Sequence, residues 1–135
     1  MERWTEEDLV EVRDRVDDVA STLPGTVVQH ERGHTRWFVR RRRFAWLLVD
    51  HHGDGRLALA VRAVPGQQSD LVRSDPDRWF VPAYLGARGW VAAQVDPGHE
   101  PDWDHVEHLL VESWRLAAGA RDIARFDAGR AAPPA

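Results

Sequence analysis

The sequence has no cysteine, which excludes disulfide bonds, thiolate metal sites and cysteine nucleophiles. Lysine and asparagine are absent as well, so arginine is the sole strongly basic side chain. No apolar run approaches the roughly 18 residues needed to cross a bilayer. The charged residues 1–7 also lack the apolar stretch of a signal peptide. We therefore expect a cytoplasmic protein that makes no use of membranes and folds by packing alone.

The apolar residues that are present suffice for one folded domain. With 135 residues and a hydrophobic share of 43%, the chain can close a single core but not two. Seven tryptophans, against one tyrosine and one methionine, supply much of the large apolar area. Their indole N–H groups require hydrogen-bond partners when they are enclosed. We expect one domain over residues 1–127 and a flexible C-terminal tail over residues 128–135, which are rich in alanine and proline.

Hydrophobic periodicity predicts helices at both ends of the domain and strands between them. One helix is expected from about Glu6 to Ser21, and a longer one begins after Asp102 as its N-cap and ends near Gly119. Strands are expected over residues 26–31, 36–40, 43–50, 56–62 and 90–95, with a short helix over residues 67–73. This order predicts an α+β fold, in which an antiparallel sheet of about five strands carries the N- and C-terminal helices on one face.

Four consecutive arginines separate the second and third predicted strands. From Arg32 to Arg43 there are six arginines and no acid, a local charge of +6, although the formal net charge of the chain is −4. A two-residue type I′ turn would need positive φ at two arginines, so we expect a longer or bulged turn that projects as a wing. The candidate anion-binding residues are Arg32, Arg36, Arg40, Arg41, Arg42 and Arg43.

Two uses of this arginine cluster are open. The guanidinium groups can contact the phosphates of nucleic acid, most directly DNA, without sequence preference. Alternatively, the cluster is solvated, or it is paired with Asp50, Asp54 or the acids of another chain, in a protein-interaction module or homodimer. An isoelectric point near 5.9 is low for a domain built to bind nucleic acid, and it favours the second use.

Other polar clusters have more ordinary interpretations. The first predicted helix carries acids on one side that could gather a hard cation weakly: Glu7, Glu11, Asp14 and Asp18. We interpret them as a solubilising surface. His105 and His108 are one helical turn apart but lack a third metal ligand, and His51 and His52 lie in a predicted turn. The sequence thus predicts no metal site and no cofactor.

Catalytic residues are not apparent either. The serines lack the context of a nucleophile elbow or a triad: Ser21, Ser69, Ser74 and Ser113. We therefore predict that the protein is not an enzyme. Trp37, Trp79 and Trp90 could stack nucleic-acid bases or cap a pocket, but tryptophan on a strand is more often a core residue.

Several short segments, taken in order, resemble the MmcQ/YjbR family over roughly Leu23 to Asp127. They are Leu23-Pro24-Gly25, Gly33-His34 before Trp37-Phe38-Val39, Arg43-Phe44-Ala45, Ser74-Asp75-Pro76 through Phe80-Val81-Pro82-Ala83-Tyr84, Gly89-Trp90-Val91 and Glu112-Ser113-Trp114-Arg115-Leu116-Ala117. The resemblance implies a fold similar to that of frataxin, with two helices on one face of an antiparallel sheet. It also implies a small non-catalytic binding domain, because members are described as candidate DNA-binding proteins with a double wing of loops and strands.

The chain departs from the pattern of this family at two places. Members often carry glycine or lysine at the hairpin turn, where this chain has Arg41 and Arg42. Members also often carry Pro-Lys-Arg-Leu after the last helix, where this chain has Ala120-Arg121-Asp122-Ile123. The second departure removes a net positive charge from a candidate phosphate-facing position.

Overall fold

The computed structural model describes residues 3–31 and 33–131. Its elements are α1 (Glu6–Ala20), β1 (Thr26–Glu31), β2 (His34–Val39), β3 (Arg42–Val49), η1 (His51–Gly53), β4 (Leu57–Val61), α2 (Gln67–Ser74), β5 (Trp79–Phe80), η2 (Leu85–Arg88), β6 (Val91–Gln94), η3 (Pro97–His99), α3 (Trp103–Ala117) and α4 (Ala120–Ala131). The strands form one antiparallel sheet in the order β1-β2-β3-β4-β6-β5. The predicted α+β class is confirmed, with one strand more than expected, because the two residues of β5 are too few to show an alternation.

The two long helices begin where the sequence predicts. At the start of α1 the Thr5 hydroxyl accepts a hydrogen bond from the Asp8 N–H, and the Asp8 carboxylate accepts one from the Thr5 N–H, which makes a capping box. At the start of α3 the Asp102 carboxylate accepts a hydrogen bond from the His105 N–H. Both helices turn an apolar stripe to the sheet, so their positions follow from periodicity and capping together.

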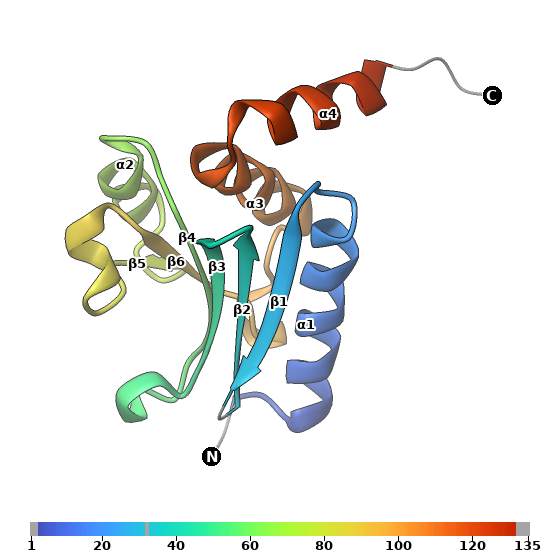
Figure 1. Ribbon diagram of the computed structural model, residues 1–135. Helices are drawn as coiled ribbons and strands as arrows, with labels where there is room; N and C mark the ends of the chain where they lie inside the picture. Colours follow the sequence, from blue (N-terminus) through green and yellow to red (C-terminus); the bar gives the residue numbers. More distant parts are fainter. Residues whose placement is uncertain (1–2, 32, 132–135) are drawn as a thin grey trace.

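Helices α1 and α3 cover one face of the sheet, and the main core lies between them and the strands (Figure 1). Within this core the indole of Trp37 donates a hydrogen bond to Asp17 at 2.8 Å, and that of Trp114 donates to the Pro24 carbonyl at 3.2 Å. Burying one such side chain contributes about 4 to 6 kcal/mol as an upper bound. The enclosed indoles thus have the partners that their burial requires.

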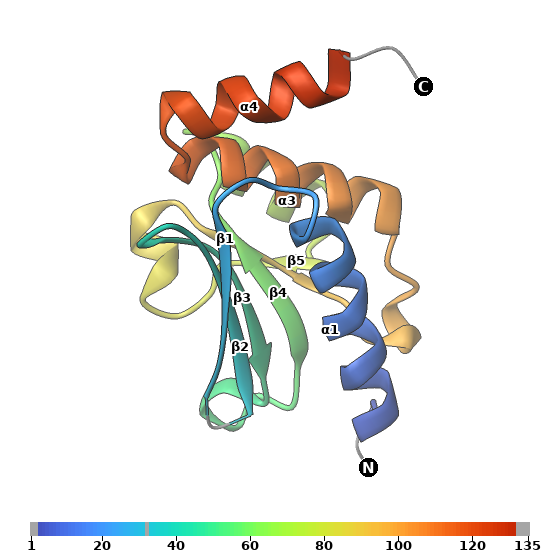
Figure 2. The same cartoon turned by 45° about the vertical axis from the view of Figure 1, so that its right-hand side comes forward.

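Helix α4 crosses the end of the molecule above α3 instead of lying on the sheet (Figure 2). It continues to Ala131, so the chain is still helical beyond residue 127, where the sequence analysis placed the start of a flexible tail. Residues 132–135 of that expected tail lie outside the described residues. No helix in residues 3–31 and 33–131 combines the length and the apolarity that crossing a membrane demands.

The sheet face opposite α1 and α3, here called the outer face, carries a second and smaller apolar cluster. Its buried members are Leu48, Ala58, Ala60, Leu85, Trp90 and Ala92. The segment that includes η2 lies against this cluster, and alanines on β4 and β6 leave room for its close approach. Trp37 and Trp79 belong to the main core and Trp90 to this second cluster, so the interpretation of all three as core residues is confirmed.

A β-bulge decides which side chains of β3 face outward. Trp37 pairs with Ala45 and Phe38 pairs with Arg43, which leaves Phe44 as the extra residue on β3. Phe44 and Ala45 are both fully buried in the main core, whereas Arg43 lies against tryptophans of the outer face. The bulge therefore lets one strand send two consecutive residues inward and keep the preceding arginine outside.

Ser113 of α3 fixes this arrangement from the core side. Its hydroxyl donates a hydrogen bond to the Phe44 carbonyl at 2.6 Å and accepts one from the Arg62 N–H at 2.8 Å. Ser113 is fully buried, so both backbone groups depend on it for their hydrogen bonds. A residue that sequence reasoning considered only as a nucleophile thus joins α3 to β3 and to the end of β4.

We predict that Ser113→Ala lowers the free energy of unfolding by about 2 to 4 kcal/mol, because two buried backbone groups lose their partner. Urea denaturation of both proteins measures this difference. Ser74→Ala is the matched control, since Ser74 is exposed and bonds to the Leu71 carbonyl within its own helix, and it should change stability by less than about 0.5 kcal/mol. A similarly small effect at Ser113 would contradict its assigned role.

Candidate anion-binding surface

The hairpin between β2 and β3 is tighter than the sequence suggests. Val39 pairs with Arg42, so the loop consists of Arg40 and Arg41 alone. Arg40 has a φ of 59°, while Arg41 is not among the residues with positive φ, a pattern of signs that matches a type II′ turn. Of the two expected forms, a longer or a bulged turn, the longer loop is not found, and the hairpin instead carries a bulge at Phe44 of β3.

Arg40 is held by a carboxylate of helix α4. Its Nε lies 3.0 Å from Asp122 Oδ2 and its Nη2 lies 2.8 Å from Asp122 Oδ1, which makes a bidentate ion pair. The Arg40 N–H also donates to the Gly25 carbonyl at 2.9 Å. A Cβ at residue 25 would lie 2.9 Å from Arg40 Nε, so a side chain there would displace the guanidinium from this position. Arg40 therefore joins the hairpin to α4 and is already neutralised.

The other arginines nearby are held mainly by stacking on tryptophans. The Arg43 Cζ lies 4.8 Å from the ring centroid of Trp46 and 5.5 Å from that of Trp90. The Arg36 Cζ lies 4.8 Å from the ring centroid of Trp46, and the Arg62 Cζ lies 5.3 Å from that of Trp90. We call this alternating series, Arg36, Trp46, Arg43, Trp90 and Arg62, the arginine ladder. Each contact contributes about 0.5 to 2 kcal/mol, depending on how far the pair is desolvated.

Like charges crowd together in the ladder. Burial lowers the pKa of Arg43 first, and the neighbouring charges of Arg36, Arg62 and Arg88 lower it further. The pKa of Arg62 is likewise lowered by burial and then by Arg42 and Arg88. Arginine begins from so high a pKa that both groups remain charged near neutral pH. The fold therefore concentrates positive charge here at an electrostatic cost.

Carboxylates compensate this charge very little. In the part of the chain that the structure describes, Arg36 is the one ladder arginine with an acid within ion-pair range, and its nearest approach to Glu31 is 3.9 Å. Three buried donors of the ladder, Arg36 Nε, Arg43 Nε and Trp46 Nε1, have no hydrogen-bond partner among the described residues. The outer face thus carries excess positive charge beside buried N–H donors that have no partner among the described residues.

The structure separates the arginines that the sequence grouped into one wing. Arg40 is paired with α4, Arg36 and Arg43 belong to the ladder, and Arg41 and Arg42 are exposed at the hairpin. Arg32 lies outside the described residues.

Sequence reasoning missed three residues of this surface: Arg62, Arg88 and Trp46. Arg62 could have been found, because Leu57, Leu59 and Val61 alternate inward and the next residue must point outward. Arg88 left no comparable signal, since it reaches the surface through the irregular segment around η2.

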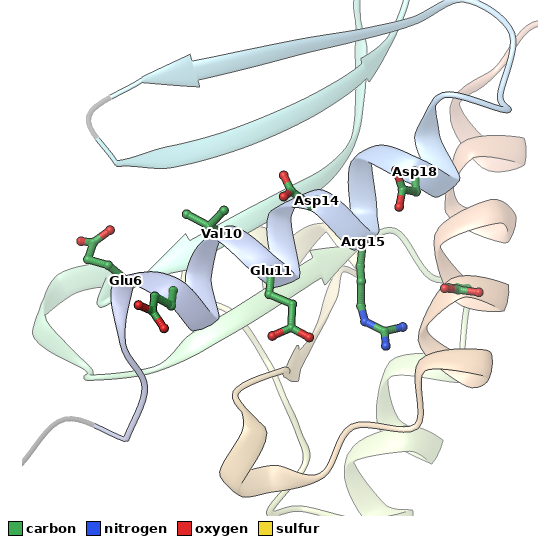
Figure 3. A pocket seen from close by; sticks show the side chains of 8 residues that line it. Glu6, Val10, Glu11, Asp14, Arg15 and Asp18 are labelled. Carbon is green, nitrogen blue, oxygen red and sulfur yellow. The ribbon is translucent and has the colours of Figure 1, made fainter.

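An open groove runs along α1, as Figure 3 shows. It is lined by Glu6, Glu7, Val10, Glu11, Asp14, Arg15, Asp18 and Glu107. The carboxylates point in different directions along the helix, and Arg15 lies among them with its Cζ 5.0 Å from the ring of Trp103. Across residues 3–31 and 33–131, no group of three or more histidine, aspartate or glutamate side chains is placed to hold a metal ion. The expected lack of a metal site stays a prediction.

Comparison with known proteins assigns the chain to a family. The YjbR family model matches residues 21–116, and the chain belongs to this family. No curated protein matches the sequence. The crystal structure of Deinococcus radiodurans protein DR2400, which carries the domain DUF419, is similar with a TM-score of 0.67 and 18% sequence identity. The match covers 85% of this chain and 87% of that chain, and it shows a shared fold alone.

The Arg40–Asp122 pair predicts a specific dependence of stability on pH. The hydrogen bond from Arg40 holds the pKa of Asp122 below its ordinary value. Its stabilisation is therefore complete above the unfolded pKa of about 3.9 and is lost as the pH falls through the lower folded pKa. We predict that Asp122→Asn destabilises the protein at pH 7 and that the difference from wild type shrinks below about pH 4.

Urea denaturation at about pH 7 and about pH 3 measures this change in the difference. Asp70→Asn is the control, because Asp70 is exposed and lies 3.9 Å from its partner Arg73. An equal effect of Asp122→Asn at both pH values would show that the pair contributes nothing through its charge.

Proposed function

We propose that this YjbR-family protein is a small, non-catalytic nucleic-acid-binding domain that contacts phosphates, most directly those of DNA, through its outer face. The contacts come from the arginine ladder and from three exposed neighbours, Arg41, Arg42 and Arg88. The observation that carries this proposal is the ladder itself, in which three guanidinium groups are held near one another while Glu31, at 3.9 Å, is the nearest compensating acid among the described residues.

The other arginines of the chain show how this protein neutralises a structural cation. Arg40 is paired with Asp122 at 2.8 Å, and Arg115 is paired with Asp127 at 2.6 Å. The ladder arginines are instead positioned by indole rings, which fix a guanidinium plane without cancelling its charge. Stacking leaves the positive charge of each guanidinium free to attract a phosphate. This difference supports a ligand-facing role for the ladder.

The acidic composition of the chain is compatible with this role because the charges are segregated. The acidic groove of α1 belongs to the helical side of the sheet, whereas the ladder lies on the outer face. Electrostatic interactions between exposed charges are screened over about 8 to 10 Å at ordinary salt. A bound polyanion therefore responds to the local arginines more than to the net charge of −4. The acidic groove of α1 disfavours binding of a polyanion to the helical side of the sheet.

Three of the four serines, Ser21, Ser74 and Ser113, donate their hydroxyls to the backbone. The hydroxyl of Ser21 donates to the Asp18 carbonyl, that of Ser74 to the Leu71 carbonyl, and that of Ser113 to the Phe44 carbonyl. Each of these bonds serves a helix end or a strand, and none of them joins a serine to a histidine. A nucleophile would instead need a general base within hydrogen-bond reach.

Salt dependence tests the proposal. If about four phosphates are contacted, affinity for a mixed-sequence oligonucleotide falls about 100-fold between about 50 mM and about 200 mM salt. Fluorescence anisotropy with single-stranded and duplex forms measures this slope. If the protein bound neither form at the lower salt concentration, the proposal would be wrong.

Substitutions locate the binding surface. The double variant Arg42→Ala/Arg88→Ala removes two exposed charges that take part in no ion pair or ring stack among the described residues, so it leaves the fold intact. We expect it to reduce the salt slope by about 1.5 to 2 and to weaken binding. Arg73→Ala, which removes an exposed charge on α2, is the control and should leave affinity unchanged. Equal effects of both changes would place the interaction elsewhere.

Strand β1 favours a second candidate function, self-association. It forms one edge of the sheet, and its valines Val27 and Val28 are 47% and 36% exposed. An edge strand with exposed apolar residues can pair with the same strand of a second copy. Light scattering across a range of concentrations would then show twice the monomer mass, and Val28→Lys would restore the monomer. Val64→Lys, at an exposed valine outside β1, is the control. A monomeric mass throughout would reject this candidate.

A further inference from the structure

A row of aromatic and imidazole rings continues from the arginine ladder along the outer face. The ring of Trp46 lies 6.1 Å from that of His34 and 5.5 Å from that of His51. His51 lies 4.1 Å from His52, whose ring lies 5.7 Å from that of Tyr84. We call this series, from His34 and Trp46 through His51 and His52 to Tyr84, the ring row. Trp46 belongs to both the ladder and the ring row, so the two features meet there.

The far end of the ring row is exposed and conformationally strained. Tyr84 is 81% exposed, although an aromatic ring of this size is usually at least partly enclosed. Tyr84 has a φ of 65° and His52 has a φ of 55°, and both values are unusual for residues with a side chain. Backbone strain of this kind concentrates at ligand sites. Here the two strained residues are the ones whose rings meet.

His51, in the middle of the ring row, is shifted toward its neutral form. Burial lowers the pKa of His51 first, and the nearby His52 and His34 lower it further, while Asp54 acts weakly in the other direction. A neutral imidazole presents a π face to a neighbouring ring. The ring row therefore differs in chemistry from the ladder that it adjoins.

The fold places the ladder and the ring row so that one extended ligand can reach both. Strand β3 runs from the hairpin tip to the η1 turn, which lies at the opposite end of the sheet (Figure 1). Its eight residues span about 26 Å. Arg43 lies near the start of this strand, Trp46 near its middle, and His51 and His52 follow its end. A ligand that lies along β3 thus contacts the arginine ladder near the hairpin and the ring row near η1.

We infer that the ring row stacks unpaired bases and that the preferred ligand of the outer face is single-stranded nucleic acid. This inference rests on the proposed function. Phosphates would lie on the arginine ladder while bases stack on the rings toward Tyr84. A duplex offers phosphates but keeps its bases stacked on one another, whereas a single strand offers every base face to an aromatic side chain.

The test compares three ligands of equal phosphate number: an oligothymidine of about twelve nucleotides, an abasic strand of the same length, and a duplex. Fluorescence anisotropy at one salt concentration gives each affinity. We expect the oligothymidine to bind about tenfold more tightly than the abasic strand, and the duplex to resemble the abasic strand.

Substitutions at Tyr84 separate stacking from charge. Tyr84→Ala should weaken oligothymidine binding about tenfold without changing the affinity for the abasic strand. Tyr84→Phe, which retains the ring, should recover the wild-type preference. Val64→Ala is the control, because Val64 is exposed but lies outside the ring row. Because Tyr84 is exposed, we expect both variants to fold as the wild type does. Circular dichroism of each variant verifies this.

The outcomes distinguish this inference from the function on which it rests. Equal affinity for the abasic and thymidine strands, or an effect of Tyr84→Ala on both of them, would overturn the ring row as a stacking site. If Arg42→Ala/Arg88→Ala still weakened all three ligands, phosphate binding by the outer face would stand without it. Failure of the wild-type protein to bind any of the three would overturn both.

Discussion

The two buried hydrogen bonds of Ser113 hold together the features on which the outer face depends. One bond fixes the Phe44 carbonyl at the β-bulge, and the other fixes the Arg62 N–H at the end of β4. The bulge sends Phe44 inward and leaves Arg43 on the outer face, where Arg62 Nε donates to the Arg43 carbonyl at 2.7 Å. A single hydroxyl on a core helix therefore determines the relative positions of two cations on the far side of the sheet. Packing in the core and the positions of the outer-face arginines are therefore linked through the backbone of β3.

The distribution of arginine gives the molecule two unlike sides. On the helical side, acids of α1 line an open groove, and Arg15 among them is the exception. On the outer face, tryptophans hold arginines of which, among the described residues, Arg36 alone has an acid within ion-pair range. An elongated anion approaching at random would be turned by this asymmetry before it made contact, since the field of a protein acts on encounter as well as on the final complex. The net charge of −4 gives no indication of this asymmetry between the two sides.

The fold was largely predictable because its signals are local. The N-cap at Asp102, the strand alternations and the stops at glycine each act within a few residues. The site was less predictable because its determinants are not local. Arg40 tolerates a positive φ because Gly25 and Asp122, distant in sequence, bind its backbone and side chain. The bulge at Phe44 is set by α3, so a run of consecutive arginines gives no indication that its members go to different neighbours.

Helix α4 lies outside the segment matched by the YjbR family model, yet it controls one charge of the hairpin. Asp122 binds Arg40 through both carboxylate oxygens, and the absence of a side chain at Gly25 makes room for that contact. Displacement of α4 would leave Arg40 without its counter-ion beside the exposed Arg41 and Arg42, and it would leave the Asp122 carboxylate of the departing helix unpaired. Asp122 of α4 is therefore the counter-ion of Arg40, and the docking of α4 sets the net charge of the hairpin.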